Sequence, residues 1–459
     1  MKNINKAKKT SLIRYSIIFI GLIFLAFSLL HNKEDEIENI TTNAIEGFIK
    51  KVQKPKVKGV DNILLYENTE NNIISINITF KGGSALDTEG YDGISNFLAN
   101  AMIMGAGGYS VSDFSKMFEE YSIKINTQVN RDSITFEITT LNYYKSRAFN
   151  LLGLILNSPN LSNNEITLTR DNLIAEYNIK SQQPRYLVGQ ALRKQLFGNH
   201  KYFGDISGNP TTISKITPHI LKDFKSKVIT KSNMYIAISG NISKNEVETE
   251  LNKITSNLPN GDKDFLTLEY VEPSFANKVI EISPKGASQS EVLIAFNSPR
   301  INTPMYPYAR VLNTYMGLMP DSLLFNTLRN EKGLVYTVNS VLYQDSITNY
   351  WLVSLGVSLD NSSEAIDSVK QILDDLKNQQ YNIKDIIIAK NWMLDNELRY
   401  FSNNRNIAAY LNNMQFLGIS LNRNAEYAKL YANLSSDKID QLLKEINTYE
   451  ITIVKVVKF

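Results

Sequence analysis

Residues 82–102 read Gly-Gly-Ser-Ala-Leu-Asp-Thr-Glu-Gly-Tyr-Asp-Gly-Ile-Ser-Asn-Phe-Leu-Ala-Asn-Ala-Met, and they are the most informative stretch of the chain. An alternating apolar segment at 74–81 comes just before them and predicts a strand, so the paired glycines mark its end. From Gly90 to Met104 the pattern becomes helical, because apolar residues recur along one face with a period of 3.6. These residues are Ile94, Phe97, Leu98, Ala101 and Met102.

The same helix has two asparagines four residues apart. Positions i and i+4 lie on one helix face, so two histidines there can share a zinc ion while a glutamate polarises bound water. The stretch resembles the insulinase/pitrilysin family of zinc metallopeptidases, notably its bacterial processing-peptidase-like members, whose helix carries His-x-x-Glu-His. Here the frame reads Asn96-x-x-Ala99-Asn100, and neutral amides are poor zinc donors. Glu176 matches the family's third ligand, but one carboxylate does not hold zinc, so the resemblance implies neither a metal nor a catalytic residue in this chain.

A second motif lies in the C-terminal half. Residues 328–336 read Leu-Arg-Asn-Glu-Lys-Gly-Leu-Val-Tyr and are similar to the family's Leu-Arg-x-x-x-Gly-Leu-x-Tyr signature. In the family this arginine and tyrosine face the zinc site across a substrate chamber. The resemblance implies that Arg329 and Tyr336 bind substrate, because their N–H and O–H groups can hold a peptide carbonyl and the oxyanion formed on it. The alternative is that Arg329 is a solvated residue at a helix end and Tyr336 an ordinary strand aromatic.

The N-terminus has the pattern of an export signal. Five cations and no acid occupy residues 1–14, and an apolar stretch follows that spans residues 12–30. This predicts a signal or anchor segment at 1–33 and a tether at 34–56. An uncleaved anchor would hold the protein in a bacterial inner membrane, with its bulk facing the periplasm. A cleaved leader would leave it soluble in the periplasm.

The rest of the chain predicts an α+β fold with two homologous domains. The N-terminal peptidase-like domain is expected at 57–262, a linker at 263–277 and the C-terminal domain at 278–459, each domain having a mostly antiparallel sheet with helices on one face. The two halves show a similar order of elements, which indicates duplication. The main predicted helices are 111–121, 144–156, 163–182, 184–197, 244–258, 306–316, 322–331, 363–378, 383–401, 407–417 and 436–446, and the strands are 133–140, 233–239, 291–296, 335–342, 350–358 and 451–457.

Composition excludes several classes of protein. The 459 residues are 43% hydrophobic and 21% charged, which is ordinary globular usage. The absence of cysteine excludes disulfides, thiolate metal sites and a thiol nucleophile, and only three histidines are present. Subtracting the five leader cations from the net charge of +3 leaves −2 for the rest, so nucleic acid is not an expected partner.

Together these observations favour a zinc-less subunit of an exported heterodimeric metallopeptidase. Its expected partners are a homologous zinc-bearing subunit, peptide substrates and the inner membrane through residues 12–30. The isolated chain is then expected to be inactive, and zinc would be a cofactor only of the partner. Two alternatives stay open: a structural scaffold subunit, and a peptide-binding module that acts without any peptidase role.

Overall fold

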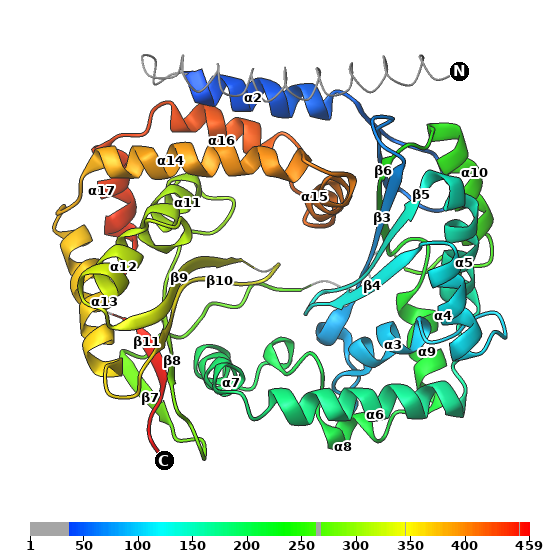
Figure 1. The fold of residues 1–459 in the computed structure, drawn as a ribbon, viewed down its shortest axis with the longest axis horizontal. Coiled ribbons are helices and arrows are strands. Elements are labelled where there is room, and N and C mark those ends of the chain that lie inside the picture. Colours follow the sequence, from blue (N-terminus) through cyan, green and yellow to red (C-terminus); the bar gives the residue numbers. More distant parts are fainter. Residues whose placement is uncertain (1–35, 263–267, 345, 449) are drawn as a thin grey trace, which may run out of the picture.

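The computed structural model describes residues 36–262, 268–344, 346–448 and 450–459. The predicted membrane segment at 12–30 lies outside these residues. Over the described ranges, every helix is too short or too polar to cross a bilayer. Two α+β halves, each built on one sheet, face each other across the molecule (Figure 1).

The sheet of the first half has six strands in the order β1-β2-β6-β3-β5-β4 over the described residues. All neighbouring strands are antiparallel except β2 and β6, which are parallel. The strands are β1 (Val52–Gln53), β2 (Asn62–Glu67), β3 (Ile73–Lys81), β4 (Lys124–Val129), β5 (Ser133–Leu141) and β6 (Met234–Gly240).

The sheet of the second half repeats this order without the short outer strand. Its order is β7-β11-β8-β10-β9, and again only the pair next to the edge, β7 and β11, is parallel. Two sheets with one topology confirm the predicted two-domain α+β fold. The strands are β7 (Lys278–Ile282), β8 (Ser290–Phe296), β9 (Val335–Gln344), β10 (Asn349–Val357) and β11 (Thr452–Val456).

Helices fill the connections in both halves. In the first half they are α3 (Ile94–Met102), α4 (Val111–Glu120), α5 (Lys145–Asn157), α6 (Asn163–Lys180), α7 (Pro184–Phe197), α8 (Pro210–Ile213), α9 (Pro218–Val228) and α10 (Lys244–Thr255). In the second half they are α11 (Tyr306–Asn313), α12 (Leu323–Phe325), α13 (Ser362–Lys377), α14 (Ile383–Leu398), α15 (Asn404–Phe416), α16 (Arg423–Tyr431) and α17 (Ser436–Glu445). The helices predicted at 306–316 and 322–331 both end in π-helical turns, at Thr314–Leu318 and Asn326–Glu331.

One helix from each half packs against the sheet of the other half. Helix α7 lies against β8 and β11, where Val188, Leu192 and Leu196 join Leu293 and Ala295 in one buried cluster. In return, α15 lies against β3 and β6 of the first sheet (Figure 1). The prediction that helices cover one face of each sheet is therefore incomplete, because the second face is covered from the other half.

The contact made by α15 is polar because β3 alternates apolar and polar residues. Its apolar residues face the core of the first half, and Asn77 and Thr79 are buried on the other face. The Asn412 Nδ2 group donates to Asn77 Oδ1 (2.5 Å) and to Thr79 Oγ1 (2.8 Å). Gln415 Nε2 donates to the Ile236 carbonyl at 2.8 Å. These bonds satisfy side chains that would otherwise be costly to bury.

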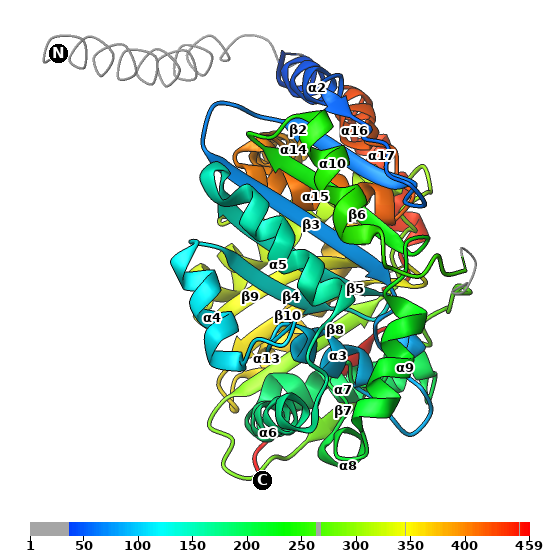
Figure 2. The ribbon, with the colours of Figure 1, turned by 90° about the vertical axis from the view of Figure 1, so that its right-hand side faces the viewer.

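The segment predicted as a tether at 34–56 contains a docked helix, α2 (Glu36–Ile49), so this expectation needs correction. Figures 1 and 2 show α2 lying along α16 and α14 of the second half. Glu38 and Lys390 form a buried ion pair at this contact. The Phe48 ring packs on Tyr66 of the first half and on Phe401 of the second, with centroid distances of 4.3 Å to each. The helix was missed because its polar residues suggested a solvated segment, whereas the buried pair satisfies one of them.

The described part of the predicted linker is also docked. Residues 263–267 lie outside the described ranges, but Val271 N donates to the Ile347 carbonyl at 2.8 Å. Tyr270 Oη donates to Asn349 Oδ1 at 2.7 Å, and Phe275 packs against the cluster beneath α7. Residues 268–277 therefore belong structurally to the second half.

Replacing Glu38 by glutamine should destabilise the protein strongly. The change leaves the Lys390 ammonium buried without a countercharge, which costs about 3–5 kcal/mol of unfolding free energy. Urea denaturation of the full chain, followed by circular dichroism, measures this loss. The matched control is Glu46→Gln on the same helix, because Glu46 pairs with Lys429 at the surface and should matter little. Equal effects of the two changes would contradict a buried anchor at Glu38.

Candidate functional site

Helix α3 is packed into the core of the first half by one apolar face. Gly93 precedes it with φ +91°, a left-handed conformation that favours glycine. The predicted apolar stripe is confirmed, since Ile94, Phe97, Leu98, Ala101 and Met102 are all fully buried.

The two positions of this helix that match the zinc-binding histidines of the motif are Asn96 and Asn100, and their side chains are hydrogen-bonded to each other. Asn100 Nδ2 donates to the Asn96 carbonyl at 2.8 Å and to Asn96 Oδ1 at 3.3 Å. Ala99 is fully buried, and Glu176 is exposed on α6, which packs against α3. Over the described residues, no group of three His, Cys, Asp or Glu side chains could hold a metal ion. The donor set at this site therefore does not fit zinc.

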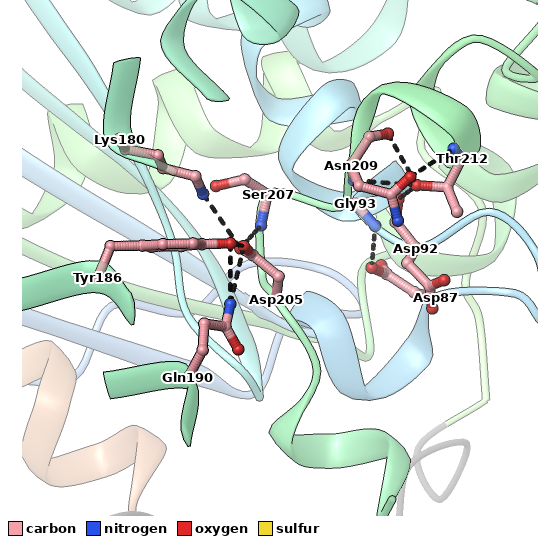
Figure 3. Close-up of polar contacts among 10 residues, drawn as sticks. All are labelled: Asp87, Asp92, Gly93, Lys180, Tyr186, Gln190, Asp205, Ser207, Asn209 and Thr212. Atoms are coloured by element: carbon pink, nitrogen blue, oxygen red, sulfur yellow. Dashed lines mark hydrogen bonds and ion pairs between the residues drawn. The ribbon is translucent and has the colours of Figure 1, made fainter. Parts of the chain in front are cut away.

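A buried carboxylate, Asp87, supports the start of α3 (Figure 3). Its Oδ2 accepts from Gly93 N at 2.6 Å and its Oδ1 from Ser95 N at 3.1 Å, so it satisfies two free N–H groups of the first turn. Burial raises the pKa of Asp87 to about 7, against the lowering effect of these hydrogen bonds. The Ser95 hydroxyl donates to the Gly83 carbonyl at 2.7 Å, which ties the helix to the Gly-Gly turn.

The loop after α7 touches the same helix start. Gly93 and Gly208 lie so close that a β-carbon on either would collide with the backbone of the other segment. Thr212 Oγ1 donates to the Asp92 carbonyl at 2.8 Å, and Asn209 caps α8 (Figure 3).

The carboxylate of Asp205 organises this loop further upstream. It accepts from Lys180 Nζ (3.1 Å), Gln190 Nε2 (3.0 Å) and Ser207 N (2.9 Å), and also from the Tyr186 hydroxyl (Figure 3). Helices α6 and α7 are thereby joined to the loop that supports α3. Sequence reasoning missed both Asp87 and Asp205, because isolated aspartates in loops carry no spacing signal.

The two residues of the C-terminal motif lie near each other in the chain, at the end of the π-helical turn and in β9. Arg329 Nη1 donates to the carbonyl of Val335, the residue before Tyr336, at 2.7 Å. Both side chains are exposed, with 52% of Tyr336 accessible, so the other N–H groups and the phenol are available to a ligand. They belong to the second half and α3 to the first, and Figure 1 shows α3 and β9 in different halves of the molecule.

A cavity of about 1070 Å³ separates the two halves. The first half contributes the β3 and β5 faces and the β4–β5 turn, and the second contributes β9, α14, α15 and α16. The lining is rich in charged and amide groups. Sequence reasoning could not find it, because its walls come from segments hundreds of residues apart. Lining residues include Gln128, Arg131, Glu137, Arg310, Tyr343 and Glu397.

Two models of one peptidase family match the chain in succession. The model described as insulinase (peptidase family M16) matches residues 62–209. The model described as peptidase M16 inactive domain matches residues 215–391.

Individual relatives span nearly the same range. A "non-peptidase homolog" from Helicobacter pylori is 24% identical over 407 residues, covering 85% of this chain and 91% of its own. An "uncharacterized zinc protease" from Bacillus subtilis is 21% identical over 333 residues, covering 72% and 80%. A crystal structure of a peptidase M16 inactive domain from Pseudomonas fluorescens has the same fold, with a TM-score of 0.81 at 20% identity, covering 89% of this chain and 98% of that one.

Asp87 should make stability depend on pH. Its folded pKa of about 7 lies above that of an unfolded aspartate, so the folded state binds the proton more tightly. Its contribution to stability is complete below about pH 4 and is lost as pH rises to about 7, with a slope of at most about 1.4 kcal/mol per unit.

Asp87→Asn should remove this slope, which thermal melting at half-unit steps from pH 4 to 8 would measure. The control is Asp171→Asn at an exposed carboxylate of α6, whose profile should parallel that of the unchanged chain. A persisting slope in Asp87→Asn would assign the titration to another group.

Proposed function

Because the chain belongs to the insulinase (M16) peptidase family, we propose that it is the zinc-less subunit of an exported two-chain metallopeptidase. A homologous subunit with an intact His-x-x-Glu-His would hold the zinc. This chain would complete the chamber and hold the peptide through Arg329 and Tyr336. Residues 12–30 would hold it at the inner membrane with its folded part in the periplasm, or direct its export if they are cleaved.

The observation that carries this proposal is the selective loss at α3. The helix, its apolar stripe and its Asp87 support are intact, while positions 96, 99 and 100 offer no zinc ligand. At the same time Arg329 is positioned by its bond to the Val335 carbonyl, with most of its N–H donors free for a ligand. The name of the Helicobacter pylori relative, a non-peptidase homolog, agrees with loss of the zinc chemistry.

The chemistry available to Arg329 and Tyr336 is electrostatic. A peptide carbonyl can accept from a guanidinium N–H and from the phenol O–H, and both bonds strengthen as negative charge develops on that oxygen. The pair cannot activate water, since neither group is a base at neutral pH. It therefore requires a nucleophile generated elsewhere, which is why a zinc-bearing partner is part of the proposal.

Peptidase activity should appear only in the two-chain mixture. The purified chain alone should not cleave a quenched fluorescent peptide, and a homologue with intact His-x-x-Glu-His should gain activity when the chain is added. Arg329→Ala should lower the activity of the mixture by a factor of about 10². Arg329→Lys should restore little of this activity, because a lysine ammonium lacks the planar, fixed set of N–H donors of a guanidinium.

The control variant is Lys384→Ala, at an exposed cation of α14, which should leave the mixture fully active. Melting temperatures of all variants exclude unfolding as the cause. Chelator-sensitive cleavage by the isolated chain would refute the proposal. A mixture indifferent to Arg329→Ala would favour a structural scaffold.

A further inference from the structure

One arginine in the wall of the cavity, Arg131, forms no ion pair with any residue that the structure describes. Only 8% of Arg131 is exposed, and its Nε is buried without a hydrogen-bond partner. Among the described residues, no ion pair or hydrogen bond involves its guanidinium. An unpaired buried guanidinium is costly, so it requires an explanation.

The other buried or half-buried arginines of this cavity are compensated. Arg310 is ion-paired with Glu397, whose second oxygen accepts from Asn424 Nδ2 at 2.5 Å. Arg423 donates to the Ile301 carbonyl at 3.2 Å and to the Tyr427 hydroxyl at 2.9 Å. Arg131 is thus an exception within its own cavity, and it lines the open space directly.

The backbone that carries Arg131 is rigidly held. It lies in the turn between β4 and β5, and the Gly-Gly segment bonds to three successive carbonyls of that turn. Gly82 N donates to the Asp132 carbonyl (2.7 Å), Ser84 N to that of Asn130 (3.2 Å) and Ala85 N to that of Arg131 (2.7 Å). Gly83 has φ +65°, and a β-carbon there would collide with the Asn130 carbonyl. The backbone from which the Arg131 side chain extends is therefore held in one conformation.

A second guanidinium lies nearby on α7. Arg193 is half-buried, and its Nε is also buried without a partner. Burial is the largest cause that lowers the pKa of Arg193, and the positive charge of Arg131 adds to it, while the Asp205 carboxylate acts in the opposite direction. Arg193 does not line the cavity, so the candidate anion-binding group in this wall is Arg131.

Aromatic rings lie beside Arg131 and at one part of the cavity wall. The Arg131 guanidinium carbon lies 5.9 Å from the centre of the Phe203 ring, which stacks on Phe197. Tyr343 and Tyr350 of the second half stack at 4.5 Å, and Tyr343 lines the cavity. A cation–π contact at this distance is weaker than the ion pair of Arg310, so it does not replace a counterion.

We propose that Arg131 forms a carboxylate-binding subsite in the cavity between the two halves. A guanidinium binds a carboxylate through parallel N–H bonds, and the cavity is large enough for several residues of a peptide attached to that group. The ligand class is therefore a peptide bearing a carboxylate, at its C-terminus or on a side chain. Only the peptide nature of the ligand rests on the proposed function; the carboxylate subsite needs no partner chain.

Binding to the isolated full chain tests this inference. The probes are a fluorescein-labelled heptapeptide of Ala and Gly with a free C-terminal carboxylate, its C-terminal amide, and the amide with one internal aspartate. Fluorescence anisotropy should show at least tenfold tighter binding of a carboxylate-bearing peptide than of the plain amide. If the free acid binds most tightly, the carboxylate that the subsite recognises is the peptide C-terminus. If the aspartate-containing amide binds most tightly, it is a side-chain carboxylate.

Arg131→Gln should abolish the preference. Arg300→Gln is the control, since Arg300 pairs with Glu272 at the surface and does not line the cavity. Without ligand, Arg131→Gln should melt at the same or a higher temperature, because it removes an uncompensated buried charge. Equal binding of all three peptides, a preference that survives in Arg131→Gln, or a sharp drop in its melting temperature would each overturn the proposal.

Discussion

The reciprocal exchange of α7 and α15 determines how the rest of the molecule is arranged. One contact is apolar, made by α7 on the second sheet, and the other is a network of amides, made by α15 on β3. Because each sheet has two buried faces and only one is covered by its own half, neither half can satisfy its sheet alone. The separation of the sheets, and with it the cavity between them, is thus built into the core. The helix α2 adds a third contact across the same boundary.

The state of α3 shows that packing and chemistry can be lost separately. The apolar stripe that holds this helix lies on one face, and the frame positions Asn96 and Asn100 are half-buried on another. The Asn100 amide donates to the Asn96 carbonyl and to Asn96 Oδ1, so this donor is satisfied within the helix. Ala99 fills a fully buried position. A helix whose stability comes from burial rather than from metal binding retains its shape when the ligands disappear.

The sequence predicted the features that depend on neighbouring residues, such as helix ends and strands. It did not predict the features that depend on contacts between distant segments. The helix at Pro184–Phe197 was predicted with both ends correct, because proline at the first position and glycine after the last are local signals. Both sheets were expected from alternation. The docking of α2, the exchange of helices and the cavity depend on pairs such as Glu38 with Lys390, which no periodicity reveals. Arg131 was invisible for the same reason, since an arginine in a hairpin turn ordinarily faces water.

The Gly-Gly turn that carried the family resemblance has a physical role that outlasts zinc binding. Its backbone holds the turn of Arg131, and the Gly83 carbonyl accepts the Ser95 hydroxyl from α3. One short segment therefore fixes both α3 and the hairpin at the cavity wall. Substitution at Gly83 would disturb both at once, because its left-handed backbone and its closeness to Asn130 exclude a β-carbon. The geometry of the cavity wall by itself therefore requires this turn, without any appeal to catalysis.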